Sequence, residues 1–138
     1  MEKIKVLVGL TRCGIAAGAN KVFEKFNQIK ENEHLPFELT KTGCIGMCYR
    51  EPLVEIIDES GSYLYGEIDE NKTIEIIEKH IKLGEPVKEY VVKTELFQNE
   101  DDTYWQGQVK IALRNCGVIN PEIIEEYENR GGYQAIKN

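Results

Sequence analysis

The stretch that decides how the fold begins, residues 4–26, reads IKVLVGLTRCGIAAGANKVFEKF. Its first part, residues 4–10, is a short apolar run rich in β-branched side chains, which is typical of a strand. The period then changes, and apolar side chains recur at three- and four-residue steps through Ile15, Val22 and Phe26. That spacing places them on one face of a helix. The stretch therefore predicts a strand followed directly by an amphipathic helix.

The next segments extend this unit into a sheet. Residues 36–42 (PFELTKT) favour a second strand, and a strand–helix–strand order favours a crossover between two parallel strands. Residues 52–57 (PLVEII) and 62–68 (SYLYGEI) are two further apolar runs, separated by a polar turn with glycine at 58–61. A turn of this kind between two apolar runs predicts an antiparallel hairpin.

A second helix closes the unit, with Asp69 or Asn71 as its cap and Gly84 at its end. Its expected buried stripe consists of Ile74, Ile77 and Ile81. We expect His80, on the same helix, at the surface or half-buried and not as a ligand. The order β-α-β-β-β-α over residues 1–86 is that of a thioredoxin-like domain. This is an α/β fold with a four-stranded mixed sheet and packed helices.

Residues 87–138 differ in character and predict a short, mostly helical C-terminal extension. It opens with a short extended run at 87–94. One helix is expected to contain Trp105 and Val109, and the Asn-Pro pair that opens segment 120–128 predicts the start of another. The extension is too short to build a core of its own, so we expect it to pack on the first domain, on a partner or on further sequence. Trp105 is its expected anchor on the sheet.

Composition excludes several classes of protein. The 138 residues carry a net charge of -7 and a pI near 5.0, which argues against nucleic acid as the main partner. With 41% hydrophobic and 30% charged residues the chain is globular, and no apolar run approaches the roughly 20 residues that span a bilayer. The opening lacks the apolar stretch of a signal peptide, so we expect no membrane insertion and a cytoplasmic location. Cysteines stay reduced there.

Three of the four cysteines converge in the predicted fold. Cys13 follows the first strand, while Cys44 and Cys48 lie in the loop after the second. Parallel strands joined by a crossover end at the same edge, so the two loops are neighbours. Thiolates with nearby backbone N–H groups suit an iron–sulfur cluster. Buried filler cysteines and a zinc site remain alternatives, although Cys-x3-Cys is not the usual zinc spacing. A thioredoxin-like dithiol is disfavoured because Cys-x-x-Cys is absent.

The same residues carry a resemblance to a known family. The segment 42–48 (TGCIGMC), the run 51–54 (EPLV) and the Tyr65-Gly66 pair resemble the thioredoxin-like [2Fe-2S] ferredoxins, in which TGC-x3-C is a ligand motif. Residues 13–19 (CGIAAGA) look like the first-helix cysteine motif of that family. The resemblance implies one [2Fe-2S] cluster with Cys13, Cys44 and Cys48 as metal ligands.

The extension carries a second resemblance. Residues 108–117 (QVKIALRNCG), the segment 120–122 (NPE) and the region 127–133 resemble the opening of the NADH-binding flavoprotein subunit of complex I. Related NAD(P)-linked hydrogenases and formate dehydrogenases fuse a thioredoxin-like ferredoxin domain ahead of the flavin domain. The chain ends before the glycine-rich loop that holds flavin and NADH in that family. We therefore expect no FMN or NAD site and no catalytic residue in this chain.

The family's [2Fe-2S] site uses four cysteines, and this sequence matches only three of them. The first would precede Cys13 by five positions, where Val8 stands, so the fourth ligand is open. Cys116 is interpreted as a buried cysteine at the end of a helix. The leading hypothesis is an iron–sulfur electron-transfer module of an NADH-linked oxidoreductase, with other subunits as partners and a homodimer as a further expectation. The alternative is a cluster-free docking or assembly domain of the same kind of complex.

Overall fold

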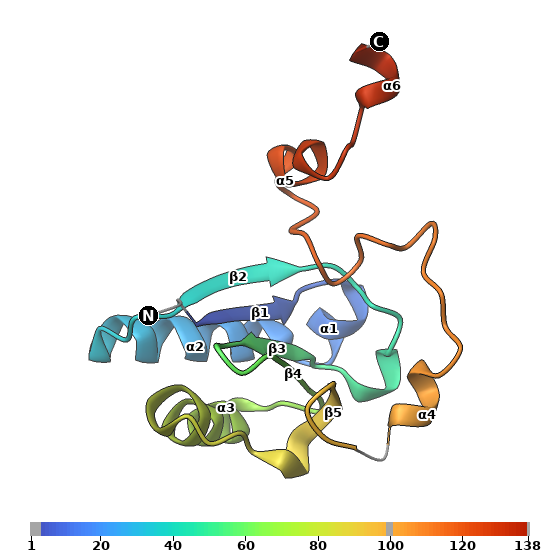
Figure 1. Cartoon of the computed structure of the whole chain (residues 1–138). Helices are drawn as coiled ribbons and strands as arrows, with labels where there is room; N and C mark the ends of the chain where they lie inside the picture. Colours follow the sequence, from blue (N-terminus) through green and yellow to red (C-terminus); the bar gives the residue numbers. More distant parts are fainter. Residues whose placement is uncertain (1–3, 99–100, 138) are drawn as a thin grey trace.

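The computed structural model describes residues 4–98 and 101–137. Its centre is a five-stranded sheet in the order β2-β1-β3-β4-β5 (Figure 1). The strands are β1 (Lys5–Gly9), β2 (Glu38–Thr42), β3 (Val54–Ile57), β4 (Ser62–Tyr65) and β5 (Val91–Thr94). β1 and β2 are parallel, with Gly9 opposite Thr42, and the remaining pairs are antiparallel. The predicted α/β class, crossover and hairpin are confirmed.

The sheet has one strand more than the predicted four. The extended run after residue 87 forms a short 3-10 turn, η3 (Lys88–Tyr90), and then β5, which pairs antiparallel with β4. Val91 and Val92 of β5 are both buried. The sequence analysis placed this run in the extension because its pairing partner, β4, lies almost 30 residues earlier and no local pattern reveals a long-range pairing.

The helices cover one face of the sheet. They are α1 (Arg12–Ala16), α2 (Ala19–Glu33) and α3 (Glu70–Ile76), the last continued by a π-helical turn, η2 (Ile77–Lys82). The predicted first helix is broken at Gly18, whose φ of 103° is in the left-handed region, and Ile15 is therefore exposed instead of on the buried face. Asp69 caps α3 as predicted, accepting a hydrogen bond from the Lys72 N–H at 2.8 Å.

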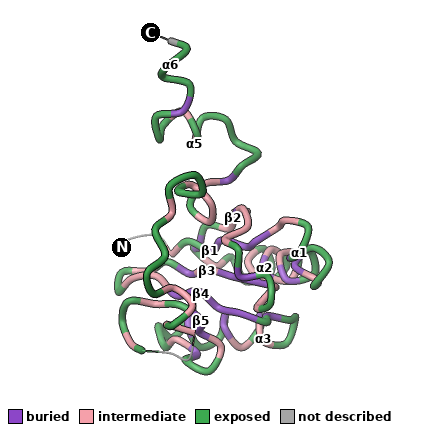
Figure 2. Tube along the Cα trace, turned by 90° about the vertical axis from the view of Figure 1, so that its right-hand side faces the viewer, coloured by how far each residue is buried: buried purple, intermediate pink, exposed green. Residues whose placement is uncertain are grey.

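The main core lies between this face of the sheet and the helices α2 and α3. Its members share near-complete burial, and they include Val6, Val8, Val22, Phe26, Val54, Ile56, Tyr65 and Ile76. Figure 2 shows the buried positions concentrated along the strands. Within α3 and η2, Ile76 and Ile77 are fully buried while Ile74 is 40% exposed, so the stripe predicted through Ile74 is wrong at that position.

His80 is fully buried, in contrast to the half-buried or surface position expected for it. The Tyr65 hydroxyl lies 2.7 Å from His80 Nδ1, and Nε2 lies 2.8 Å from Asp58 Oδ2. Asp58 also accepts hydrogen bonds from the backbone and hydroxyl of Ser60 and from the Gly61 N–H. Each polar group of this chain therefore has a partner, which makes its burial affordable.

The extension has less helix than predicted. Its helical turns are α4 (Asp102–Trp105), α5 (Ile124–Asn129) and α6 (Gln134–Lys137), and residues 106–123 form turns and irregular chain. The predicted helix through Val109 is therefore wrong, and the second begins at Ile124 instead of Pro121. Figure 1 shows α5 and α6 projecting away from the sheet, and most of their positions are exposed (Figure 2).

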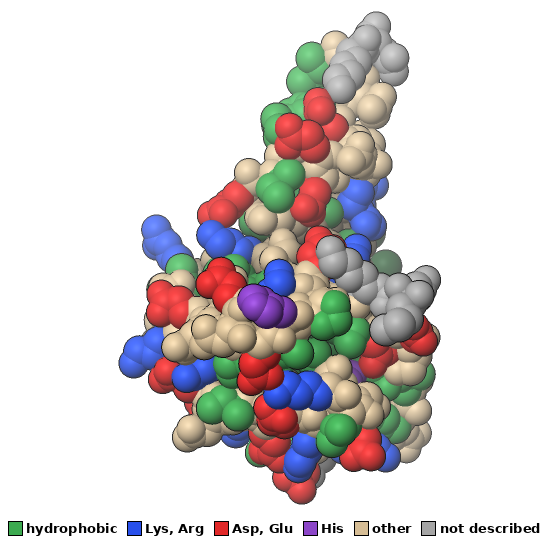
Figure 3. All heavy atoms as spheres, turned by 90° about the vertical axis from the view of Figure 1, so that its left-hand side faces the viewer, with side chains coloured by type: hydrophobic (Ala, Val, Ile, Leu, Met, Phe, Trp, Pro, Cys, Tyr) green, Lys and Arg blue, Asp and Glu red, His purple; other side chains and the backbone are tan. Residues whose placement is uncertain are grey.

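The surface agrees with the charge balance of the sequence. Figure 3 shows acidic and basic side chains interspersed over one face of the molecule, without a large area of either sign. Among the described residues, no helix has the length and apolar character needed to cross a membrane.

The buried Tyr65–His80–Asp58 chain predicts how stability varies with pH. Burial lowers the pKa of His80 below its usual 6.5, outweighing the hydrogen bond to Asp58. Partial burial would raise the pKa of Asp58, but hydrogen bonds from Ser60 and His80 outweigh it and lower that pKa. For both groups the unfolded chain binds protons more readily, so their contribution is present above pH 6.5 and is lost as the pH falls.

We expect urea unfolding to show a free energy of unfolding that decreases between pH 7.5 and pH 5. His80→Gln should flatten this slope and, by leaving the Tyr65 hydroxyl and Asp58 with poorer partners, cost about 1–3 kcal/mol at neutral pH. His34→Gln, at the exposed end of α2, is the matched control and should keep the slope. Equal slopes for His80→Gln and the unmodified protein would contradict the prediction.

Candidate metal centre

Cys13 stands in α1, directly beyond the carboxyl end of β1, and its side chain is exposed. The next residue, Gly14, is buried against the end of β1, where a Cβ atom would collide with the Gly9 carbonyl oxygen. Only glycine allows this approach. Gly14 therefore holds the first turn of α1, and with it Cys13, tightly at the edge of the sheet.

The loop with the other two cysteines is anchored by the residue between them. Met47 is fully buried in a second core cluster with Leu53, Leu64 and Val92, on the face of the sheet opposite α2 and α3. Cys44 is half-buried, and Cys48 opens the short turn η1 (Cys48–Arg50) with its side chain exposed. With Met47 fixed inside, the two cysteines on either side are held at the surface of the loop.

The three predicted thiols lie near one another. The pKa of Cys48 is raised to about 11, first by its hydrogen bond with the Cys13 thiol and then by the nearby charges of Cys44 and Cys13. The Gly46 N–H donates to Cys44 Sγ at 3.3 Å, a contact that favours a thiolate. All four cysteines are free. In the part of the chain that the structure describes, no three His, Cys, Asp or Glu side chains meet closely enough to hold a metal ion.

The extension holds the cysteine loop from outside. The Tyr104 hydroxyl donates to the Gly46 carbonyl oxygen at 2.9 Å, and Asp101 accepts from the Tyr49 hydroxyl at 3.2 Å. Arg50 joins the two parts by an ion pair of 3.0 Å with Asp101, both side chains being partly buried. The sequence analysis predicted an aromatic anchor, and Trp105 does pack beside the second core cluster. It missed the clamp on the loop, because contacts some 50 residues apart leave no local pattern.

A second part of the extension crosses the start of the same loop. Gly117 packs directly on the Ile45 side chain, and the Thr42 hydroxyl lies 3.5 Å from the Ile119 carbonyl oxygen. Cys116 is half-buried in a turn, so its interpretation as a buried helix-end cysteine is wrong. It lines a cavity of about 460 Å³ together with Ile45 and Trp105.

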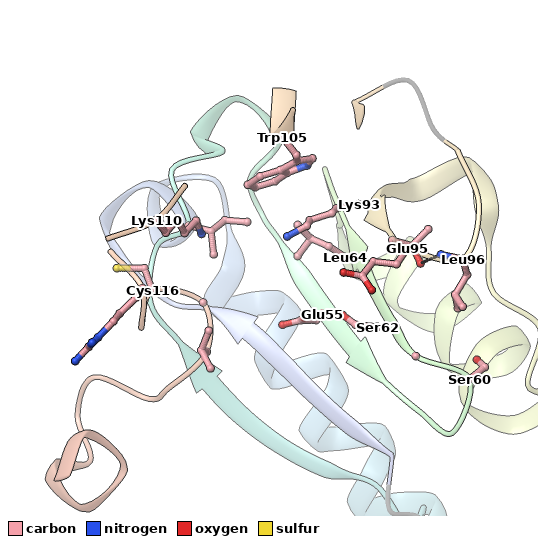
Figure 4. A pocket seen from close by; sticks show the side chains of 16 residues that line it. Glu55, Ser60, Ser62, Leu64, Lys93, Glu95, Leu96, Trp105, Lys110 and Cys116 are labelled. Atoms are coloured by element: carbon pink, nitrogen blue, oxygen red, sulfur yellow. Dashed lines mark hydrogen bonds between the residues drawn. The ribbon is translucent and has the colours of Figure 1, made fainter. Parts of the chain in front are cut away.

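That cavity opens over the face of the sheet that the helices leave free. Figure 4 shows Glu55, Leu64 and Lys93 rising from the strands toward it, with Trp105 and Lys110 on the extension above. The Lys93 ammonium lies 4.6 Å from the centre of the Trp105 ring. This cation–π contact helps to fix the extension on the sheet.

Two further residues bear on a missing fourth ligand. Val8, at the expected position of the first cysteine, is fully buried within the main core. Glu51, which the sequence analysis did not single out, is half-buried beside Gly9 and Gly14 and accepts a hydrogen bond from the Leu53 N–H at 2.9 Å. Burial raises the pKa of Glu51, and the Leu53 N–H offsets this only in part.

The clamp on the loop can be tested with one atom removed. Tyr104→Phe deletes the hydrogen bond to the Gly46 carbonyl, which should cost about 1 kcal/mol of stability and speed amide hydrogen exchange in residues 44–48. Tyr90→Phe, which removes a hydroxyl that donates to Glu75 at 2.7 Å, is the matched control and should leave exchange in that loop unchanged. Unaltered loop exchange in Tyr104→Phe would rule out the clamp.

Comparison with known proteins finds related chains, although no family model matches. The NADP-reducing hydrogenase subunit HndB of Solidesulfovibrio fructosivorans is 32% identical over 88 residues, which cover 62% of this chain and 70% of that protein. A protein named "Ferredoxin, 2Fe-2S" from Aquifex aeolicus is 32% identical over 78 residues, covering 54% of this chain and 68% of its own length.

The fold has a match among solved structures. The crystal structure of the thioredoxin-like [2Fe-2S] ferredoxin from Aquifex aeolicus superposes with a TM-score of 0.59 at 28% identity, over 68% of this chain and all of that one. The five-stranded sheet with its two packed helices, the loops that bring three thiols together and the similarity to these proteins lead to one conclusion. The chain belongs to the thioredoxin-like [2Fe-2S] ferredoxin family.

Proposed function

We propose that this protein is an electron-transfer module that holds one [2Fe-2S] cluster through Cys13, Cys44 and Cys48. The observation that carries the proposal is the proximity of the Cys48 thiol to both of the others, on two loops far apart in sequence. The names of the relatives, a 2Fe-2S ferredoxin and a hydrogenase subunit, support it. When bound, such a cluster supplies reversible one-electron transfer.

The residues of the chain fit that group in three respects. The donors are thiols, which iron–sulfur clusters require, and the Gly46 N–H already donates to one sulfur. The ligands of a two-iron cluster are divided between two metal ions, so the thiols need not converge on one point. Cys13 and Cys48 are exposed, which gives a partner protein close approach to the site.

We propose a larger oxidoreductase, of the NADH-linked kind, as the setting in which the module works, with other subunits of that complex as partners and the cytoplasm as its compartment. The HndB relative is named as a subunit, which supports a multi-subunit assembly. We divide the chain into the ferredoxin domain, residues 1–86, and the flavoprotein-like extension, residues 87–138. Apolar side chains on the extension offer a contact surface for a partner or a second copy, being 82%, 81% and 58% exposed at Val109, Ile111 and Leu113.

A cluster-free docking domain is the second candidate function. The observation that favours it is the position of Val8, an apolar side chain buried in the core where the family pattern would put a fourth cysteine. A domain of this kind would keep the fold and the exposed apolar surface of the extension and would dispense with the cofactor. The two candidates therefore differ in iron content and not in structure.

Purification without oxygen separates the two. We expect a coloured protein with about two irons and two acid-labile sulfides per chain, together with a visible spectrum that bleaches when dithionite is added. Colourless protein that takes up no iron and sulfide, even after anaerobic reconstitution, would favour the docking domain and defeat the electron-transfer proposal.

Serine variants test the ligand set. Cys13→Ser, Cys44→Ser and Cys48→Ser should each lower the iron content of the reconstituted protein severalfold, because a serine oxygen is a poorer ligand for a cluster than a thiolate. Cys116→Ser is the matched control, since Cys116 lies in the extension and lines the cavity over the sheet. Full iron content in any of the first three variants would remove that residue from the ligand set.

A further inference from the structure

The three thiols leave an iron–sulfur site one protein ligand short, and Glu51 lies where the two cysteine segments meet. A Cβ atom added to Gly14, the residue after Cys13, would stand 3.1 Å from Glu51 Oε2. One added to Gly9 would stand 3.7 Å and 3.8 Å from the two carboxylate oxygens. On the other side, the Glu51 N–H donates to the carbonyl oxygen of Cys48 at 3.4 Å. The side chain of Glu51 is therefore flanked by the segments that carry Cys13 and Cys48.

The third cysteine segment also borders this place. Glu51 lines a small cavity of about 20 Å³ together with Gly9, Thr42 and Gly43, and Gly43 is the residue before Cys44. Glycine at positions 9, 14 and 43 means that the surroundings of the carboxylate are largely backbone, with little side-chain bulk. The region around Glu51 thus adjoins all three segments that supply thiols.

The carboxylate lacks the partners that a structural role would provide. Its one hydrogen bond in the described ranges is the Leu53 N–H, and no Lys, Arg or His of those ranges forms an ion pair with it. Asp58, also partly buried, accepts hydrogen bonds from Ser60, Gly61 and His80. A half-buried carboxylate with a single amide donor is poorly compensated. A metal ion would compensate it.

The geometry points to Glu51 as the fourth protein ligand of the iron–sulfur cluster, bound through a carboxylate oxygen. This inference rests on the proposed function. Carboxylate oxygen is an established donor to iron, and ligation changes no oxidation state, because the anion fills a position that solvent would otherwise hold. The buried imidazole of His80 cannot compete, since both of its nitrogens are engaged by Tyr65 and Asp58. Val8 offers no donor atom.

The test uses the full chain, reconstituted without oxygen with 57Fe and sulfide, and reads the two iron sites by Mössbauer spectroscopy. The unmodified protein should show two unequal irons, one of them with an oxygen ligand. Glu51→Cys should make the two sites alike, as four thiolates would. Glu51→Gln should release iron to a chelator roughly tenfold faster, on the scale of a weakened metal site. Far-UV circular dichroism of the cluster-free variants checks that each is folded.

Glu55→Gln is the matched control, because Glu55 is a partly buried carboxylate on the same sheet that donates nothing to the loops and bonds to Ser62. Its spectra and iron release should equal those of the unmodified protein. Spectra of Glu51→Gln and Glu51→Cys identical to the unmodified ones would overturn the assignment, and a change in Cys116→Ser instead would transfer it to Cys116. Both of those results leave the cluster itself in place. Failure of the unmodified protein to take up any cluster would overturn the proposed function, and the assignment with it.

Discussion

The parallel pairing of β1 with β2 is the constraint on which the candidate metal centre depends. Because both strands run the same way and α2 returns the chain between them, the segments that leave them emerge at the same edge of the sheet. Cys13 and Cys44 follow within a few residues of the two strand ends. An antiparallel pair would have placed these segments at opposite edges. The contact of Gly14 with the Gly9 carbonyl oxygen then keeps α1 close to the strand end.

The loop with Cys44 and Cys48 is held from two sides. From within, Met47 is buried in the second core cluster, so displacing the loop would expose a large apolar side chain. From outside, the Tyr104 hydroxyl holds the Gly46 carbonyl and Asp101 pairs with Arg50. Exposed ion pairs contribute little to stability, but here the Asp101 side chain is only 11% exposed. The extension is therefore part of the site and not an appendage to it.

Two half-buried carboxylates in this small domain are compensated in opposite ways. Asp58 ends a chain of hydrogen bonds from Tyr65 through His80, and its other oxygen is satisfied by a turn. It lies beneath the helices, where a closed network adds rigidity. Glu51 lies at the edge that carries the thiols and has one amide donor. The contrast between a satisfied carboxylate in the core and an unsatisfied one beside the cysteines distinguishes a structural group from one available to a cofactor.

The sequence by itself determined the parts of the molecule that follow from local pattern. The change of period after Thr11 indicates a strand and then a helix, Asp69 caps α3 as its position before the helix predicts, and the polar turn at 58–61 predicts the hairpin. The TGC-x3-C spacing, with Cys13 after the first strand, was enough to select three thiols and the family. Each of these features depends on residues that are neighbours in the chain or on a single crossover.

Only the tertiary structure decided the rest, because it depends on contacts between residues far apart. β5 joins the sheet through a partner strand almost 30 residues earlier, and His80 is buried because Tyr65 and Asp58 meet it across the core. The helix predicted through Val109 does not form, since the extension follows the surface of the loop and sheet instead of its own periodicity. The place of Glu51 between two cysteine segments is likewise invisible in sequence, where it is one glutamate among many. Long-range packing determined which carboxylate lies near the thiols, and no local propensity encodes that choice.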